Sequence, residues 1–135
     1  MQIYFAGSMR GGDADTGLYK KIIAHLRKYG EVLTEHVAHG AEIDSVNTDD
    51  WIYERDMSWL RLADVVVADV SVPSIGVGYE IAKAEDMQKR ILCLYRPKRG
   101  QRLSAMISGN GSFPVMRYRT VGEALNNIDE YFKTR

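Results

Sequence analysis

Short apolar runs alternate along the chain with longer segments in which apolar residues recur every three or four positions. The short runs have the length of strands, and the longer segments have the period of helices. This alternation predicts a succession of strands and helices that builds a parallel sheet. The expected strands are Gln2–Ala6, Glu31–Thr34, Asp64–Val70, Arg90–Tyr95 and Phe113–Tyr118. The third run is nearly all apolar, which is typical of a central strand covered on both faces.

Four helices are expected between and after these strands. Thr and Asp start helices well because their side-chain oxygens accept hydrogen bonds from the N–H groups of the first turn. Gly30 follows the first helix directly and is a typical stop. The expected helices are Thr16–Tyr29, a helix capped by Thr48 or Asp49, Val77–Gln88 and Val121–Phe132.

The number and spacing of the strands favour an α/β fold of one domain, residues 1–135. We expect a flavodoxin-like or Rossmann-like doubly wound sheet of five parallel strands in the order 2-1-3-4-5, with helices on both faces. In such sheets a ligand binds beyond the carboxyl ends of the strands, where the strand order reverses. That point lies between the first and third strands.

Composition narrows the possible partners. Eighteen basic and eighteen acidic residues cancel, so the overall charge favours neither a nucleic acid polymer nor a membrane surface as partner. The chain enters its first strand without a signal-peptide pattern, and it has no apolar span near the roughly 18 residues of a membrane helix. The one cysteine, Cys93, lies in an apolar run and reads as a buried thiol. A cytoplasmic protein is expected, with the nucleus as a further location in a eukaryote.

Two glycine-rich loops follow the first and third strands. Residues 7–12 read Gly-Ser-Met-Arg-Gly-Gly, and residues 71–78 read Ser-Val-Pro-Ser-Ile-Gly-Val-Gly. Glycines let backbone N–H groups approach an anion, and Ser8, Arg10 and Ser74 can donate to phosphate oxygens. Either loop alone would be better explained as a tight turn. Both loops at one switch point favour a phosphate-containing ligand, although neither matches a Walker A or dinucleotide-binding motif.

Titratable side chains are expected near the same point. Glu80 follows the second loop, and Tyr4, His36 and Asp56 can join it. Cleavage of a glycosidic bond passes through an oxocarbenium-like centre, which needs a carboxylate at the sugar and a proton donor at the leaving group. Carboxyls about 5 Å apart would indicate a covalent intermediate, and about 6.5–9.5 Å direct attack by water.

Each of these residues also has a purely structural interpretation. Glu80 could complement the helix dipole, and Tyr4 could be an ordinary strand aromatic. His36 could be a plain loop histidine, and Asp56 could lie on a solvated helix face together with Glu54 and Arg55. No metal site is expected, because no pair among the histidines and Cys93 has a zinc-binding spacing.

Five blocks of the chain, in order, carry a family resemblance. They are residues 4–12, 33–38, 63–80, 89–97 and 103–107, and together they span nearly the whole chain. These blocks resemble the 2'-deoxynucleoside 5'-phosphate N-hydrolases of the nucleoside deoxyribosyltransferase superfamily. The resemblance implies a hydrolase that needs no cofactor or metal and cuts a 2'-deoxynucleoside 5'-monophosphate into free base and 2-deoxyribose 5-phosphate.

The resemblance also implies roles for single residues. Glu80 matches the nucleophile that forms a glycosyl-enzyme at C1', Tyr4 matches the phenol that orients it, and Asp56 matches an acid that assists at the base or sugar. Ser104 and Met106 match a segment that reaches the site of the neighbouring subunit, so a homodimer is expected. The substrate-binding residues expected from the family are Gly7, Ser8, Met9, Arg10, Gly11, Gly12, His36, Ser74, Gly76, Gly78, Ser104 and Met106.

Several questions stay open at this stage. The same nucleophile would serve a deoxyribosyltransferase that passes the sugar to a second base, and the two loops would also suit a non-catalytic nucleotide-binding module. The preferred base could be a purine, as in dGMP, or a modified pyrimidine, as in 5-hydroxymethyl-dUMP. A substrate held through its phosphate predicts poor turnover of deoxynucleosides, and a tight pocket near Tyr4 predicts rejection of ribonucleotides.

Overall fold

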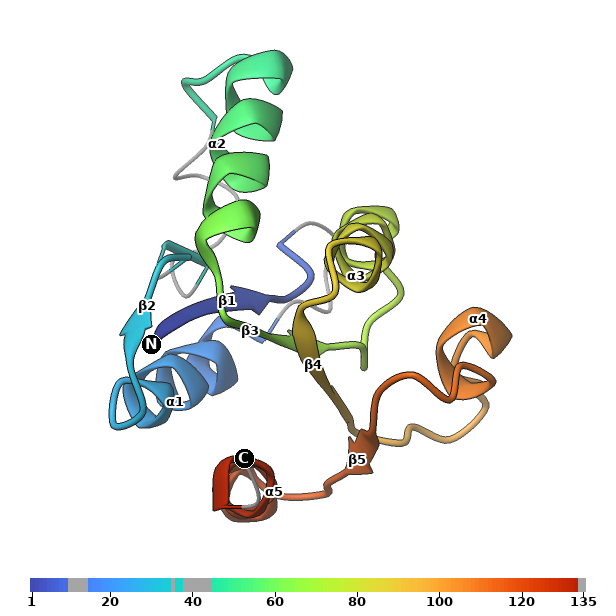
Figure 1. Ribbon diagram of the computed structural model, residues 1–135. Helices are drawn as coiled ribbons and strands as arrows, with labels where there is room; N and C mark the ends of the chain where they lie inside the picture. The colour runs from blue at the N-terminus through green and yellow to red at the C-terminus, as the bar shows by residue number, and fades with distance from the viewer. Residues whose placement is uncertain (10–14, 35, 38–44, 134–135) are drawn as a thin grey trace.

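A parallel five-stranded sheet forms the middle layer of the protein in a computed structural model (Figure 1). The structure describes residues 1–9, 15–34, 36–37 and 45–133. The strand order is β2-β1-β3-β4-β5, and every neighbouring pair is parallel, as predicted. The strands are β1 (Gln2–Ala6), β2 (Glu31–Val32), β3 (Val65–Asp69), β4 (Arg90–Tyr95) and β5 (Val115–Arg117).

The edge strands are shorter than predicted. Strand β2 ends at Val32 instead of Thr34, because the Thr34 side chain takes over the pairing with β1. Its Oγ1 accepts a hydrogen bond from the Phe5 N–H at 2.7 Å and donates one to the Phe5 carbonyl at 2.6 Å. Strand β5 covers three residues of the predicted Phe113–Tyr118.

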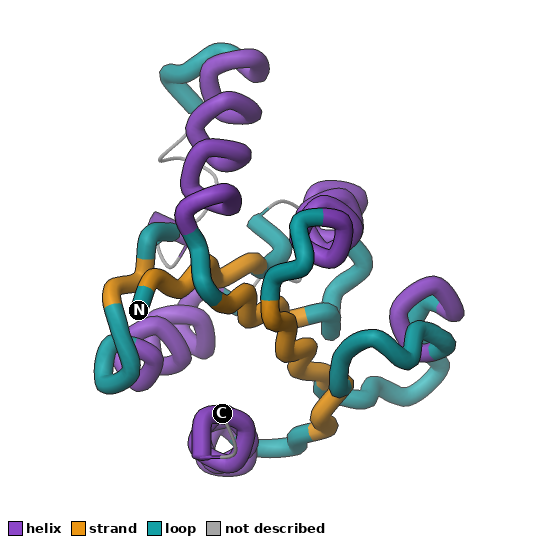
Figure 2. The backbone as a smooth tube through the Cα atoms, in the orientation of Figure 1, coloured by secondary structure: helices purple, strands orange, loops and turns teal. Residues whose placement is uncertain are grey.

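Helices cover both faces of the sheet (Figure 2). α1 (Thr16–Leu26) and α5 (Val121–Lys133) lie on one face, and α2 (Asp49–Leu62) and α3 (Ile75–Asp86) lie on the other. A short helix that the sequence did not predict, α4 (Ala105–Ser108), lies beyond α3 near the β5 edge. None of the helices in the described part of the chain is long and apolar enough to cross a bilayer.

The predicted bounds of two helices were wrong by two or three residues. α1 ends at Leu26 and not at Tyr29, because residues 27–29 continue as turns. α3 runs from Ile75 to Asp86 and not from 77 to 88. It begins early because the Ser74 side chain caps it, and it ends before Gln88, whose φ of 61° is left-handed.

Alternation along β1 divides the core into two halves. Ile3 and Phe5 pack toward α1 and α5, whereas Tyr4 and Ala6 pack toward α2 and α3. The side-chain period of a strand requires this division. It places the Tyr4 phenol on the same side of the sheet as α3. Cys93 is fully buried in that half, as predicted.

A glycine between α1 and β2 gives a test of this packing. A Cβ at Gly30 would lie 2.3 Å from the carbonyl oxygen of Met1, which accepts a hydrogen bond from the Glu31 N–H. We expect Gly30→Ala to lower the free energy of unfolding by about 1–3 kcal/mol, because backbone must move to admit the methyl group. Urea denaturation measures the change.

Gly122→Ala is the matched control. A Cβ there would come no closer than 3.8 Å, to the Thr120 hydroxyl, and alanine favours the helix α5 in which Gly122 lies. This variant should be at least as stable as the wild type. Equal stability of the two variants would contradict the predicted clash at Gly30.

Candidate functional site

Glu80 and Tyr4 meet between α3 and the sheet. Glu80 lies in the second turn of α3, and the fully buried Tyr4 points toward it from β1. The Tyr4 hydroxyl donates a hydrogen bond to Glu80 Oε2. The structure therefore brings together the two residues that the sequence placed at the centre of the site.

Burial changes the acid–base behaviour of both groups. The pKa of Glu80 is raised to about 7, chiefly because burial disfavours the charged carboxylate. The Tyr4 hydrogen bond opposes this rise, Asp56 adds to it and the positive charge of Arg55 opposes it. The pKa of Tyr4 is raised far above its ordinary value by burial and by the charges of Glu80 and Asp56, so the phenol keeps its proton and acts as a donor.

Asp56 reaches the same site from α2, paired with its neighbour. Arg55 Nη2 and Nε lie 2.9 Å and 3.0 Å from Asp56 Oδ1. Arg55 Nη2 also lies 3.0 Å from Nε2 of His36, which belongs to the short segment after β2. Three elements thus contribute Tyr4, Asp56 and His36 to one region, as the sequence analysis proposed.

The predicted solvent exposure of Arg55 was wrong. We expected it on a solvated helix face, but its side chain is only 13% exposed. Its guanidinium carbon lies 5.2 Å from the Trp51 ring centre and 4.8 Å from that of Trp59. The spacing of four residues on either side places the three side chains on one face of α2. That spacing was the signal in the sequence for a buried arginine.

The loop after β1 is described only in part. Ser8 is buried, and Met9 packs against the core on the α1 and α5 face. A Cβ at Gly7 would lie 2.8 Å from the Tyr19 ring, so this glycine is required for packing whatever else it does. Arg10, Gly11 and Gly12, which were expected to bind phosphate, lie outside the described residues.

The second predicted loop is shorter than expected, and its two glycines are helical. Ser74 Oγ accepts a hydrogen bond from the Val77 N–H at 3.2 Å and starts α3 at Ile75, so Gly76 and Gly78 lie in the first turn. A Cβ at Gly78 would meet nothing within 4 Å, and one at Gly76 would come no closer than 3.9 Å to Ser74. The glycines leave the N-terminus of α3 uncovered instead of bending the chain.

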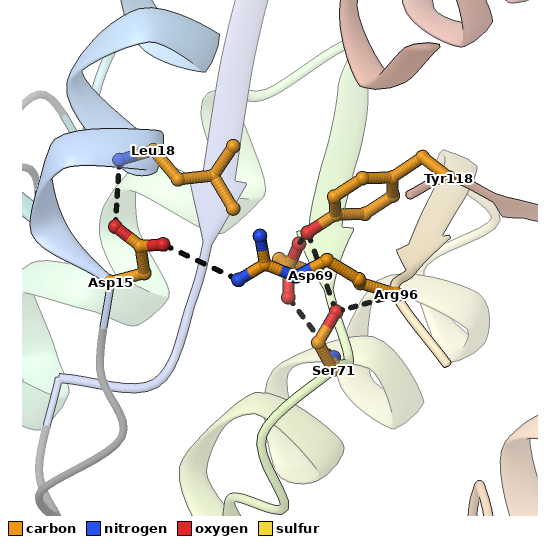
Figure 3. Close-up of polar contacts among 6 residues, drawn as sticks. All are labelled: Asp15, Leu18, Asp69, Ser71, Arg96 and Tyr118. Atoms are coloured by element: carbon orange, nitrogen blue, oxygen red, sulfur yellow. Dashed lines mark hydrogen bonds and ion pairs between the residues drawn. The ribbon is translucent and has the colours of Figure 1, made fainter. Parts of the chain in front are cut away.

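A polar network at the carboxyl ends of β3 and β4 joins Ser71, in the loop after β3, to Asp15 at the start of α1 (Figure 3). Asp69 is 2% exposed and accepts hydrogen bonds from the Tyr118 hydroxyl at 2.5 Å and the Ser71 N–H at 3.0 Å. Ser71 Oγ accepts from the Arg96 N–H at 2.8 Å, and the Arg96 guanidinium lies 3.3 Å from Asp15, the N-cap of α1. Burial raises the pKa of Asp69. The network fixes the start of the loop after β3 relative to the start of α1.

Ser104 and Met106 lie apart from Glu80 within one chain. They line an apolar cleft of about 720 Å³ beside α3, together with Ser74, Ile75 and Gly78. Glu80 and Tyr4 do not line it. Ile75 and Met106 are 95% and 81% exposed, which is unusual for large apolar side chains. Within the described residues there is no cluster of three side chains suited to hold a metal ion.

The chain is similar in sequence to proteins of one family. The family model described as nucleoside 2-deoxyribosyltransferase matches residues 3–124. The chain is 47% identical over 140 aligned residues to a 5-hydroxymethyl-dUMP N-hydrolase of Esox lucius, covering 98% of this chain and 97% of the relative. It is 50% identical over 139 aligned residues to that of Homo sapiens, covering 97% and 79%.

The fold also recurs among solved structures. A CMP N-glycosidase of Clostridium botulinum superposes with a TM-score of 0.73 at 22% identity, covering 97% of this chain and 99% of that one. At this level of identity the likeness supports the doubly wound fold.

The raised pKa of Glu80 predicts how stability depends on pH. The folded state binds the Glu80 proton more tightly than the unfolded state does. Protonated Glu80 therefore contributes its full stability below about pH 4.5, and this contribution is lost as the pH rises through about 7. Glu80→Gln should therefore exceed the wild type in free energy of unfolding by up to about 3 kcal/mol near pH 8.5. The gain should largely vanish near pH 5. Chemical denaturation at both pH values measures it.

Tyr4→Phe provides the opposite control. It removes the hydrogen bond that stabilises the ionised carboxylate, so the variant should lose more stability near pH 8.5 than near pH 5. Stability differences that are the same at both pH values for both variants would show that Glu80 is not a buried titrating group.

Proposed function

The chain belongs to the nucleoside 2-deoxyribosyltransferase family, and we propose that it hydrolyses the N-glycosidic bond of 2'-deoxynucleoside 5'-monophosphates. The products are a free nucleobase and 2-deoxyribose 5-phosphate. One observation carries the proposal: a half-buried carboxylate, Glu80, is held by a neutral phenol, Tyr4, with a second acid, Asp56, close enough to shift its pKa.

The reaction proceeds in two displacement steps. The Glu80 carboxylate attacks C1' of the sugar while the bond from C1' to the base nitrogen breaks, and the electron pair leaves with the base. A proton delivered to the base completes its departure, and Asp56 assists at the base or the sugar. Water then attacks C1' of the glycosyl ester, loses a proton and frees the Glu80 carboxylate. Tyr4 orients the nucleophile throughout.

The phosphate anchors the substrate away from the scissile bond. The first N–H groups of a helix have no partner within the helix and attract anions. At α3 this end lies beside the Ser74 hydroxyl, and Gly76 and Gly78 leave it uncovered. Ser8, Arg10 and Gly11 complete the phosphate site from the loop after β1. Binding energy from the phosphate fixes C1' over Glu80, so its loss should slow turnover as well as weaken binding.

The names of the relatives favour a modified pyrimidine as the base. Two relatives that are 47% and 50% identical are 5-hydroxymethyl-dUMP N-hydrolases, and we propose the same substrate for this chain. His36 lines the base side of the pocket in this proposal. A deoxyribosyltransferase would use the same nucleophile but has no need of a phosphate site, so hydrolysis of the monophosphate is favoured.

We also propose that two copies of the chain build each site. Ser104 and Met106 line the apolar cleft beside α3, which Glu80 of the same chain does not line. The exposed Ile75 and Met106 give that cleft the apolar surface expected of a subunit interface. A two-fold dimer would cover both clefts and bring Ser104 of each chain to the other chain's Glu80.

A direct assay tests the proposed reaction. The protein should release free base from 5-hydroxymethyl-dUMP, much less from the matching deoxynucleoside, and none from the ribonucleotide, as measured by chromatography. dGMP, assayed in parallel, tests for a purine preference. Glu80→Gln should lower kcat by at least about a thousandfold, because it removes the nucleophile.

Three other outcomes would each point elsewhere. Equal release from the deoxynucleoside would contradict the phosphate site. Transfer of the sugar to an added base in preference to water would indicate a transferase. Binding of the nucleotide without product would indicate a non-catalytic module.

Mixed dimers test the shared site. Glu80→Gln and Ser104→Ala chains, each weakly active alone, should recover activity when coexpressed, because half of the dimers then hold one site with both native residues. Random mixing predicts about a quarter of the wild-type activity per chain. Absence of recovery, with dimers confirmed by light scattering, would mean that Ser104 acts within its own chain or not at all.

A further inference from the structure

Arg55 contacts two aromatic rings on its own helix. Its guanidinium carbon lies 5.2 Å from the ring centre of Trp51 and 4.8 Å from that of Trp59, one helical turn before and after it on α2. Stacking of a planar cation between two indoles is favourable and leaves the edge of the guanidinium free to direct its N–H groups. The Arg55 guanidinium is therefore a planar donor that faces Asp56 and His36 of the candidate site.

The edge of this guanidinium contacts Asp56 and His36 at the same time. Its Nε–H donates a hydrogen bond to Asp56 Oδ1 at 3.0 Å, and Nη2 lies 2.9 Å from the same oxygen and 3.0 Å from His36 Nε2. A guanidinium only donates hydrogen bonds, so Nε2 of His36 must accept. A histidine that accepts through Nε2 carries its proton on Nδ1 and is neutral. Contact with Arg55 thus selects one tautomer of His36.

The same guanidinium contacts the Asp56 carboxylate and acts through its charge on a second carboxylate, Glu80. Within the described chain, the charged and titratable groups that act on Glu80 are Tyr4 from β1 and Asp56 and Arg55 from α2. Asp56 disfavours ionisation of Glu80, and Arg55 is the positive charge that favours it. His36, neutral in the tautomer described above, adds no charge. Without Arg55 two carboxylates would face each other with a phenol alone to stabilise them.

We propose that Arg55 is a positioning residue of the active site, which holds the Asp56 carboxylate and the Nδ1–H tautomer of His36 in place and supplies the positive charge beside Glu80. This inference rests on the proposed hydrolase activity for its kinetic consequences, but the tautomer of His36 can be measured without substrate. The arrangement needs a planar donor held rigidly, which a lysine cannot provide.

The pH profile of kcat/KM tests the electrostatic part. In the wild type, activity should fall as the pH drops through about 7, because Glu80 attacks as a carboxylate. In Arg55→Met this acidic limb should move upward by about one pH unit, and kcat should fall more than KM rises. Arg55→Lys should keep the acidic limb near its wild-type pH but should lower kcat, since lysine restores the charge without holding both Asp56 and His36.

Arg61→Met is the matched control on the same helix. Arg61 lies in the last turn of α2 and is exposed to solvent. This variant should keep the wild-type rate and pH profile. If the wild type is active and the acidic limb of Arg55→Met stays at the wild-type pH, the proposed effect of the Arg55 charge on Glu80 is overturned. An inactive wild type would instead count against the proposed function.

Nitrogen NMR of the imidazoles tests the positioning part. Near pH 8, His36 of the wild type should show a protonated Nδ1 and an unprotonated Nε2, with its signals assigned by their loss in His36→Gln. In Arg55→Met the signals should shift toward the Nε2–H form that dominates in free histidine. A wild-type His36 that already carries its proton on Nε2 would overturn the proposal, whatever the activity.

Discussion

The hydrogen bond from Tyr4 to Glu80 is the contact on which the site depends. A carboxylate that is partly withdrawn from water is costly unless donors stabilise its charge, and the buried Tyr4 phenol donates to Glu80. The phenol can serve because burial and neighbouring negative charge keep its proton in place. Burial also raises the pKa of Glu80 to about 7, so its carboxyl group changes protonation state near neutral pH.

Helix α2 supplies the charges that adjust this pair. Asp56 makes ionisation of Glu80 harder and Arg55 makes it easier, and the two are themselves in contact. The N-terminal half of α2 extends away from the sheet (Figure 1). Trp51, in that half, is half exposed and contacts the Arg55 guanidinium, whereas Trp59, nearer the sheet, contacts it and also packs against the core. The polar network around Asp69 works on the opposite face of the sheet, where it fixes the start of the loop after β3 relative to the start of α1.

Much of the fold followed from the sequence, and the failures have local causes. The strand order was predicted correctly because five strands with helical connections leave few right-handed arrangements. Tyr4 and Glu80 were expected near the same switch point, and the family resemblance implied the contact between them. The end of β2 and the start of α3 were wrong because the side chains of Thr34 and Ser74 replaced backbone partners. Arg55 was misread because a charge within a helix is ordinarily solvated.

The sequence by itself determined the periodicity of each segment, the topology of the sheet and the family to which the chain belongs. Those properties follow from residue types at short separations and from a resemblance along the whole chain. Only the tertiary structure decided which charges are desolvated: it enclosed Glu80 and Arg55 and left Ile75 exposed beside an apolar cleft. Desolvation depends on the distance between elements far apart in the chain, and local patterns carry no measure of that distance.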